Sequence, residues 1–182
     1  MRTLAMIIAL MCISLLAVGC SNAKTYGPYH GKVVDAETKE AIEGAAVLVV
    51  FYTNEPGPAG SITRYSDALE TLSDKNGAFR IPEHKVTPEK WSYFLDPHGY
   101  FTIFKPGYGC YPMYKDVKPM FVPNGMLPPK ESVTIELPRL KTTQERLSNT
   151  ILPIGVDIPK EKYRILNDLI DQELGMLGRG RK

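Results

Sequence analysis

The chain of 182 residues lacks the residue patterns that common catalytic and metal sites require. Its three histidines stand far apart, so neither a His-x-His pair nor a His-Glu-x-x-His zinc motif occurs. No serine has the Gly-x-Ser-x-Gly spacing of a hydrolase nucleophile. Asp74-Lys-Asn-Gly77 begins like a calcium loop, but no glutamate follows at the closing ligand position. We therefore expect no enzymatic activity, no bound metal and no cofactor.

An excess of charge of one sign is also lacking. The chain has 22 basic and 20 acidic residues, which gives a formal net charge of +2 at pH 7. Removal of an N-terminal leader containing Arg2 would lower that charge to +1. Nucleic-acid binding depends on a basic surface that neutralises phosphates. We therefore expect no nucleic-acid partner.

Long hydrophobic runs are limited to one, from Leu4 to Val18, and it is too short to span a bilayer comfortably. It ends in Leu16-Ala17-Val18-Gly19-Cys20, which resembles a bacterial lipobox. We expect residues 1–19 to be a signal peptide. We expect Cys20 to carry a lipid that includes a palmitate chain. Ordinary secretory cleavage with an incidental Cys20 is the alternative. Ser21 after the cysteine resembles outer-membrane sorting, which predicts a lipoprotein of the cell envelope, facing either the periplasm or the surface.

Cysteine is scarce, which excludes a disulfide framework. Of three cysteines, Cys12 would leave with the signal peptide and Cys20 would carry the lipid. Cys110 then has no partner, so the fold must depend on its hydrophobic core. A lone cysteine among aromatic residues is typical of a small buried apolar side chain. A reactive thiol is the other interpretation.

What remains after cleavage is 163 residues, enough for one domain with appendages. We expect a tether over residues 20–28, a β domain over 29–138 and a helical extension over 139–182. Period-two patterns, β-branched residues and turn residues at the boundaries indicate the strands. The expected strands cover Tyr29 to Asp35, Ala45 to Tyr52, Ala68 to Leu72, Ala78 to Ile81, Gly99 to Phe104 and Glu131 to Leu137.

Two turns are expected between these strands. Asn54 to Ser61 holds two prolines and two glycines, which predicts either a surface loop or an excursion that connects two strands. Asp74 to Gly77 contains residues that accept the left-handed conformation, which predicts a tight hairpin. Phe79 and Ile81 would then point from the following strand into the core.

The C-terminal extension has the pattern of helices. Thr142-Thr-Gln-Glu145 has the spacing of a capping box, which predicts a short helix to about Leu147. Pro159 to Leu174 places its apolar residues on one helical stripe, and Gly175 is the expected stop. This amphipathic helix packs either on its own domain or on a partner.

Three motifs together resemble the carboxypeptidase regulatory-like domain: Gly31-Lys-Val-Val-Asp35, Ile42-Glu-Gly44-Ala45-Ala-Val47, and Thr71-x-x-Asp74-x-x-Gly77-x-Phe79-x-Ile81-Pro82. The resemblance implies a mainly β fold, a transthyretin-like (prealbumin-like) β-sandwich of about seven strands, with the C-terminal helices as an appendage. Ala41 departs from the proline usual before the second motif. The family implies a non-catalytic folding, spacing or binding module in a secreted or envelope protein.

Aromatic residues are dense between Trp91 and Tyr114, and this density supplies the candidate binding surface. The candidate residues are Trp91, Tyr93, Tyr100, Tyr108, Tyr111 and Tyr114. Exposed rings would anchor an envelope protein or, alternatively, stack on a carbohydrate. The competing interpretation is that the rings build and cover the core. The membrane would be a further partner through the N-terminal lipid.

Overall fold

The computed structural model describes residues 22–58, 60–120, 125–152 and 157–179, and within them the protein is mainly β. Residues 1–19, the expected signal peptide, and Cys20 lie outside the described residues. The strands are β1 (Lys24–Tyr26), β2 (Tyr29–Asp35), β3 (Ala46–Gly57), β4 (Gly60–Leu72), β5 (Ala78–Ile81), β6 (His84–Val86), β7 (Phe94–Phe104) and β8 (Ser132–Leu137). The helices are α2 (Thr143–Ser148), the 3₁₀ turn η1 (Lys160–Lys162) and α3 (Arg164–Met176).

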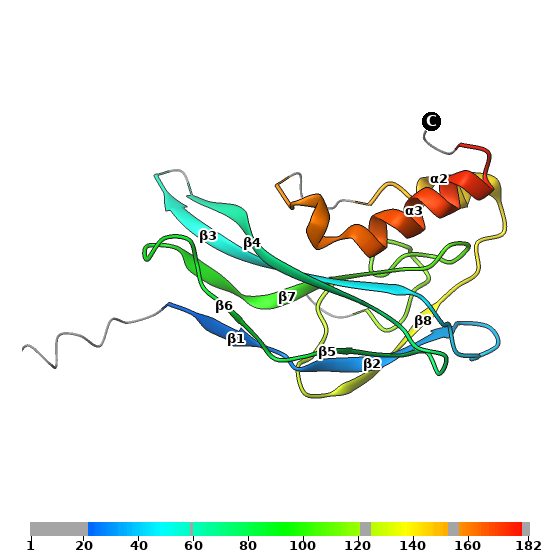
Figure 1. Cartoon of the computed structure of the whole chain (residues 1–182), viewed down its shortest axis with the longest axis horizontal. Helices are drawn as coiled ribbons and strands as arrows, with labels where there is room; N and C mark the ends of the chain where they lie inside the picture. Colours follow the sequence, from blue (N-terminus) through cyan, green and yellow to red (C-terminus); the bar gives the residue numbers. More distant parts are fainter. Residues whose placement is uncertain (1–21, 59, 121–124, 153–156, 180–182) are drawn as a thin grey trace, which may run out of the picture.

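Two three-stranded sheets form the body of the molecule (Figure 1). One has the order β5-β2-β8 and the other the order β4-β3-β7, while β1 and β6 pair as a small third sheet. Neighbouring strands are antiparallel except β2 and β8, which run parallel with His30 opposite Ser132. The first long strand of the domain therefore pairs with its last strand.

One apolar core lies between the two large sheets. Because side chains alternate across a strand, Val47, Val49 and Phe51 of β3 point into this core. They meet Phe79 of β5 and Ile135 of β8, among other buried residues. Phe79 and Ile81 are both buried, which confirms the predicted inward face of β5.

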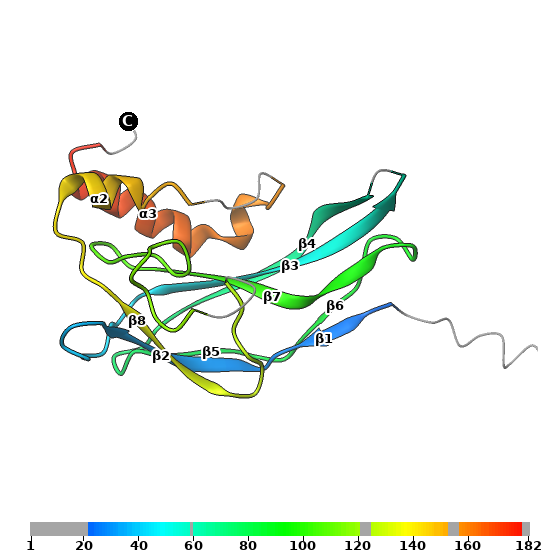
Figure 2. The ribbon, with the colours of Figure 1, turned by 180° about the vertical axis from the view of Figure 1, so that it is seen from behind.

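The other face of β3 is covered by the C-terminal helix, as Figures 1 and 2 show from opposite sides. Leu48 and Val50 pack there with Leu166 and Ile170 of α3 in a second buried cluster. The N–H groups of Ile165 and Leu166 at the start of α3 donate to the Glu70 carboxylate on β4 at 2.9 and 3.2 Å, where a negative charge complements the helix dipole. The amphipathic helix thus packs on its own domain, and β3 is apolar throughout its first half because both faces are covered.

A buried ion pair joins the two C-terminal helices. Arg146 of α2 donates from Nε and from a terminal nitrogen to the two carboxylate oxygens of Glu173 on α3, each at 2.7 Å. Glu173 is 1% exposed and also accepts from the Gly107 backbone N–H at 3.2 Å. The predicted capping box at Thr142 and Glu145 is confirmed, with both reciprocal bonds present.

Three boundary predictions are wrong. The surface-loop alternative for residues 54–61 is wrong, because β3 runs to Gly57 and β4 starts at Gly60, so the two strands extend past their expected ends as a two-stranded arm. Residues 24–26 of the expected tether form β1, which pairs with β6 and buries Tyr26. Helix α3 continues through Gly175 to Met176, and Gly178, at φ +68°, follows as the left-handed residue.

The turn at Asp74–Gly77 forms, but it does not close a hairpin. The Gly77 N–H donates to the Asp74 carbonyl at 2.8 Å, and the Asp74 side chain accepts from the N–H groups of Asn76 and Ala78. However, β4 pairs with β3 whereas β5 pairs with β2, so this turn carries the chain from one sheet to the other. Gly77 has φ +72°, and a Cβ there would lie 2.4 Å from the Val33 carbonyl oxygen, so only glycine fits.

Candidate functional site

The structure separates the six candidate aromatic residues instead of gathering them on one surface. Trp91 is 87% exposed, whereas Tyr93 and Tyr111 are buried. Tyr111 lies in the core between the sheets and donates its hydroxyl to the Met126 carbonyl at 2.7 Å. Tyr93 and Tyr111 therefore offer almost no area to a partner. Tyr93 precedes β7 and Tyr111 follows it, both outside the regular elements, so no period predicts their burial.

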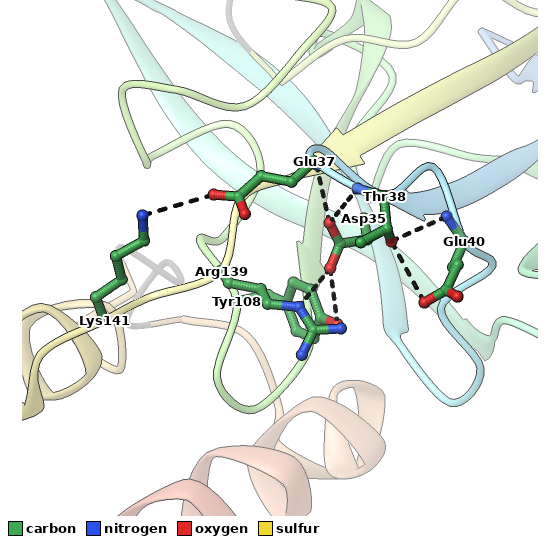
Figure 3. A network of polar contacts seen from close by, with 7 residues as sticks. All are labelled: Asp35, Glu37, Thr38, Glu40, Tyr108, Arg139 and Lys141. Atoms are coloured by element: carbon green, nitrogen blue, oxygen red, sulfur yellow. Dashed lines mark hydrogen bonds and ion pairs between the residues drawn. The ribbon is translucent and has the colours of Figure 1, made fainter.

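Tyr108 belongs to a polar network at the end of β2 (Figure 3). Its hydroxyl donates to Asp35 Oδ2 at 3.3 Å, and Arg139 Nε donates to the same oxygen at 2.5 Å. The Arg139 guanidinium carbon also lies 5.2 Å from the centre of the Tyr108 ring. Asp35 Oδ1 accepts from the backbone N–H groups of Glu37 and Thr38. The network fastens the β2 end to the residues that follow β8.

The charge of Asp35 is held strongly. Burial alone would raise its pKa, but hydrogen bonds from Thr38, Arg139 and Glu37 outweigh burial and lower the pKa to about 2. The carboxylate therefore stays ionised across the physiological range. All four donors bind the Asp35 carboxylate. We therefore interpret the network as a stabilising contact of the fold and not as a site with a free acid or base.

Tyr100 and Tyr114 line two hollows that meet at Met113. The first, of about 220 Å³, lies over the outer face of β3 and β7 and is bounded by Tyr52, Tyr100 and Pro112, among others. The second, of about 330 Å³, lies beside α2, where Tyr114, Ile151 and Leu152 contribute to its lining. We call the two hollows together the Met113 groove.

The groove walls are fixed by hydrogen bonds from the C-terminal extension. Asn149, at the end of α2, accepts from the Cys110 N–H at 2.8 Å and donates to the Tyr108 carbonyl at 2.9 Å. Tyr114 donates its hydroxyl to Glu145, the capping-box residue of α2, at 3.3 Å. The helix predicted from the Thr142 motif thus holds one wall of the groove against the segment that carries Met113.

Two apolar side chains are left open to solvent in this groove. Met113 is 56% exposed and Ile151 is 81% exposed. Neither was predicted as a site residue, and no periodic signal marks them, because both stand outside the regular elements. Exposed apolar side chains are ordinary when scattered, but neighbours that line one hollow indicate a binding surface. A methionine adapts its shape readily to a partner.

The described lining of the groove offers apolar contact, and Glu145, the carboxylate among these residues, is held by the capping box and by Tyr114. Cys110 lies just below the groove and is fully buried, and burial raises the pKa of its thiol far above its usual range. This agrees with the interpretation of Cys110 as a small apolar core residue. Among residues 22–58, 60–120, 125–152 and 157–179, no three His, Cys, Asp or Glu side chains gather as a metal site would need.

A second charged cluster elsewhere resembles an acid–base pair. His84 Nε2 lies 2.8 Å from Asp67 Oδ2, and Lys162 Nζ lies 2.8 Å from Asp67 Oδ1. Burial raises the pKa of Asp67, but hydrogen bonds from Lys162 and His84 outweigh it and the net shift is downward. The three residues come from β4, β6 and η1, so the cluster joins the small sheet and the C-terminal segment to the edge of the large sheet.

Comparisons with known proteins give no identification: no family model, no curated protein and no solved structure matches the chain. In the described part of the chain, no helix has the length and apolar character to cross a bilayer.

Proposed function

We propose that the protein is a non-catalytic, lipid-anchored module of the bacterial cell envelope that binds a protein partner. The Cys20 lipid would hold the protein at the membrane, and Ser21 would direct it to the outer membrane. Its fold would be the transthyretin-like β-sandwich of the carboxypeptidase regulatory-like domain. The two three-stranded sheets around one core, with the motif residues Phe79 and Ile81 buried in it, support that assignment.

The observation that carries the binding role is the Met113 groove. Its lining is mostly apolar, its walls are fixed by Asn149 and Glu145, and Met113 and Ile151 stand open to solvent within it. Burying one large apolar side chain contributes about 1.5–3 kcal/mol to binding, and a methionine and an isoleucine together would anchor a peptide. The occupant that fits is an extended apolar segment of an envelope protein.

A carbohydrate is supported less well than a protein. Sugar stacking needs a ring face presented to solvent, but Tyr100 meets Tyr52 edge to face, with centroids 5.6 Å apart and planes at 64°. Trp91, the most exposed ring among the described residues, lies in the β6–β7 connection at the opposite end of the molecule from α2 (Figure 1). The six candidate aromatic residues therefore supply no continuous platform.

Photo-crosslinking in cells tests the groove. A photoreactive amino acid at Ile151 should give one discrete adduct with an envelope protein, and Met113→Glu should weaken it about tenfold or more because a charge enters an apolar contact. The matched control places the same amino acid at Met176, which is 55% exposed but outside the groove. The same adduct from position 176, or none from 151, would contradict the protein-binding role. An adduct that a glycosidase removes would favour the carbohydrate.

Membrane fractionation tests the anchor separately. Cys20→Ser removes the only group that the lipid would modify, so the chain should move from the membrane to the soluble fraction. The Ile151 adduct depends on the groove and not on the cysteine. Unchanged membrane association of Cys20→Ser would refute the lipid anchor and leave the groove to be judged by crosslinking.

A further inference from the structure

Three large apolar side chains are exposed at one end of the molecule. Trp91 is 87% exposed, Phe94 is 64% exposed and Ile62 is 54% exposed. Phe94 pairs with Asn54 and Ile62 pairs with Glu55, so the two residues lie at adjacent levels of the β4-β3-β7 sheet and their side chains leave it on opposite faces, which gives this end apolar groups on both sides. We call Trp91, Phe94 and Ile62 the apolar tip.

The chain enters the fold at this same end. Figures 1 and 2 both place the start of β1, the end of β3 with the start of β4, and the β6–β7 connection together at one end of the long axis. The Asn22 side chain donates a hydrogen bond to the Trp91 carbonyl, which fixes the entering chain against the tip. Pairing of β1 with β6 holds the next residues in place.

This arrangement limits the distance from Cys20 to the tip. Cys20 precedes Asn22 by two residues, and two residues of extended chain span at most about 7 Å. A lipid on Cys20 would therefore place the acyl chains beside the tip. Residues 22–28 do not lift the domain away from the membrane, because β1 is part of the fold.

We propose that the apolar tip docks into the lipid surface next to the anchor, so that the domain is held at the membrane in one orientation. The inference rests on the lipid anchor of the proposed function. Tryptophan suits the boundary between lipid head groups and acyl chains, because its ring is large and apolar while its N–H remains polar. Tethering makes the contact intramolecular, with an effective concentration on the order of millimolar, so a weak affinity of the tip suffices.

The charges around the tip favour an anionic lipid surface. Lys24, Lys85 and Lys90 lie on β1, on β6 and in the β6–β7 connection at this end, against Glu89 and Asp96, which leaves an excess of one positive charge among these five groups. Glu55 is paired with Arg64 at 2.6 Å, so the pair adds no net charge. Basic residues beside an inserted apolar group strengthen attachment to anionic head groups.

The single tryptophan makes the contact directly measurable. Trp91 is the only tryptophan of the chain, so fluorescence reports the tip alone. The full lipidated chain is incorporated into vesicles of phosphatidylethanolamine and phosphatidylglycerol, with or without bromine on the acyl chains. Flotation of the vesicles and quenching of Trp91 are measured on the same sample. Docking predicts strong quenching by the brominated lipid.

Matched variants test whether the tip, and not any exposed apolar side chain, makes the contact with lipid. Phe94→Ser with Ile62→Ser should shift the docking equilibrium about tenfold or more toward the undocked state and reduce the quenching. The control, Met176→Ser with Leu72→Ser, removes two side chains that are 55% and 45% exposed and lie outside the tip, and it should leave the quenching unchanged.

Each result decides between the two proposals. A chain that floats with the vesicles but shows equal fluorescence with brominated and plain lipid would overturn docking and leave the anchor standing. Equal loss of quenching in the control variant would also overturn it. A chain that does not float at all would refute the anchor, and the docking with it.

Discussion

Replacing Asp35 by asparagine tests how far one buried carboxylate stabilises the fold. Its two oxygens accept from four donors: the N–H groups of Glu37 and Thr38 at 2.9 and 3.0 Å, Arg139 Nε at 2.5 Å and the Tyr108 hydroxyl at 3.3 Å. An asparagine keeps one carbonyl oxygen but turns an NH₂ group toward groups that also donate. The variant therefore leaves buried donors without an acceptor.

The cost follows from these contacts. A hydrogen bond to a charged group contributes about 1.5–3 kcal/mol. The Asp35 side chain is 1% exposed while that of Arg139 is 54% exposed, so solvent screens part of the ion pair. We expect Asp35→Asn to lower the free energy of unfolding at pH 7 by about 2 kcal/mol.

The loss should depend on pH in a defined direction. The pKa of Asp35 lies at about 2 in the folded protein, below its ordinary value of 3.8. A lowered pKa contributes stability that is fully present above pH 4 and disappears as the pH falls toward 2. After allowance for screening, about 1–2 kcal/mol of the difference between wild type and variant should disappear over that window.

Urea unfolding followed by circular dichroism at pH 7, 5 and 3 measures this difference. Asp116→Asn is the matched control, since Asp116 is exposed and the same chemical change is made there. The wild-type advantage over Asp35→Asn should be equal at pH 7 and 5 and smaller at pH 3. An advantage that stays constant down to pH 3, or that the control reproduces, would refute the reasoning.

Two further predictions concern buried groups. Arg146→Met leaves the buried Glu173 carboxylate with the Gly107 N–H as its remaining donor, so we expect the free energy of unfolding, measured by thermal unfolding, to fall by about 3 kcal/mol. The double variant with Glu173→Met should recover part of this loss. Additive losses from the two substitutions would contradict the pairing. Cys110 should not react with a thiol reagent in the native protein and should react fully in denaturant, because its thiol is buried and its pKa is raised. Rapid labelling under native conditions would show the thiol to be accessible.

Local patterns in the sequence predict the strands and the helices well. The period of two in residues 131–137 and the apolar run from Ala45 correspond to β8 and β3, and the Thr142 motif forms its capping box. These features depend on neighbours within a few residues, so composition and spacing contain the information. The stop of α3 was misplaced because Gly175 sits on an open helix face, where nothing lies within 4 Å of an added Cβ.

Long-range pairing was not predictable in the same way. Pro56 and Gly57 indicate a loop by composition, yet the arm is stabilised across the strands by the Thr63–Asn54 hydrogen bond and the Arg64–Glu55 ion pair. The split between buried Tyr93 and exposed Trp91 likewise depends on the packing of distant segments. The candidate site was therefore found only in part: Tyr100 and Tyr114 were named, whereas Met113 and Ile151 were not.

The parallel pairing of β2 with β8 also sets the order in which the protein can be completed during synthesis. His30 can pair only after Ser132 has been synthesised, 102 residues later. At about 5–20 residues per second, that interval is roughly 5–20 seconds. During that time, one edge of β2 has unpaired backbone groups, and its apolar face lacks the β8 side chains. An unpaired strand edge of this kind is a template for aggregation. The β2–β8 pairing can therefore be completed only once Leu137 is available, and truncation before that point should leave an insoluble product.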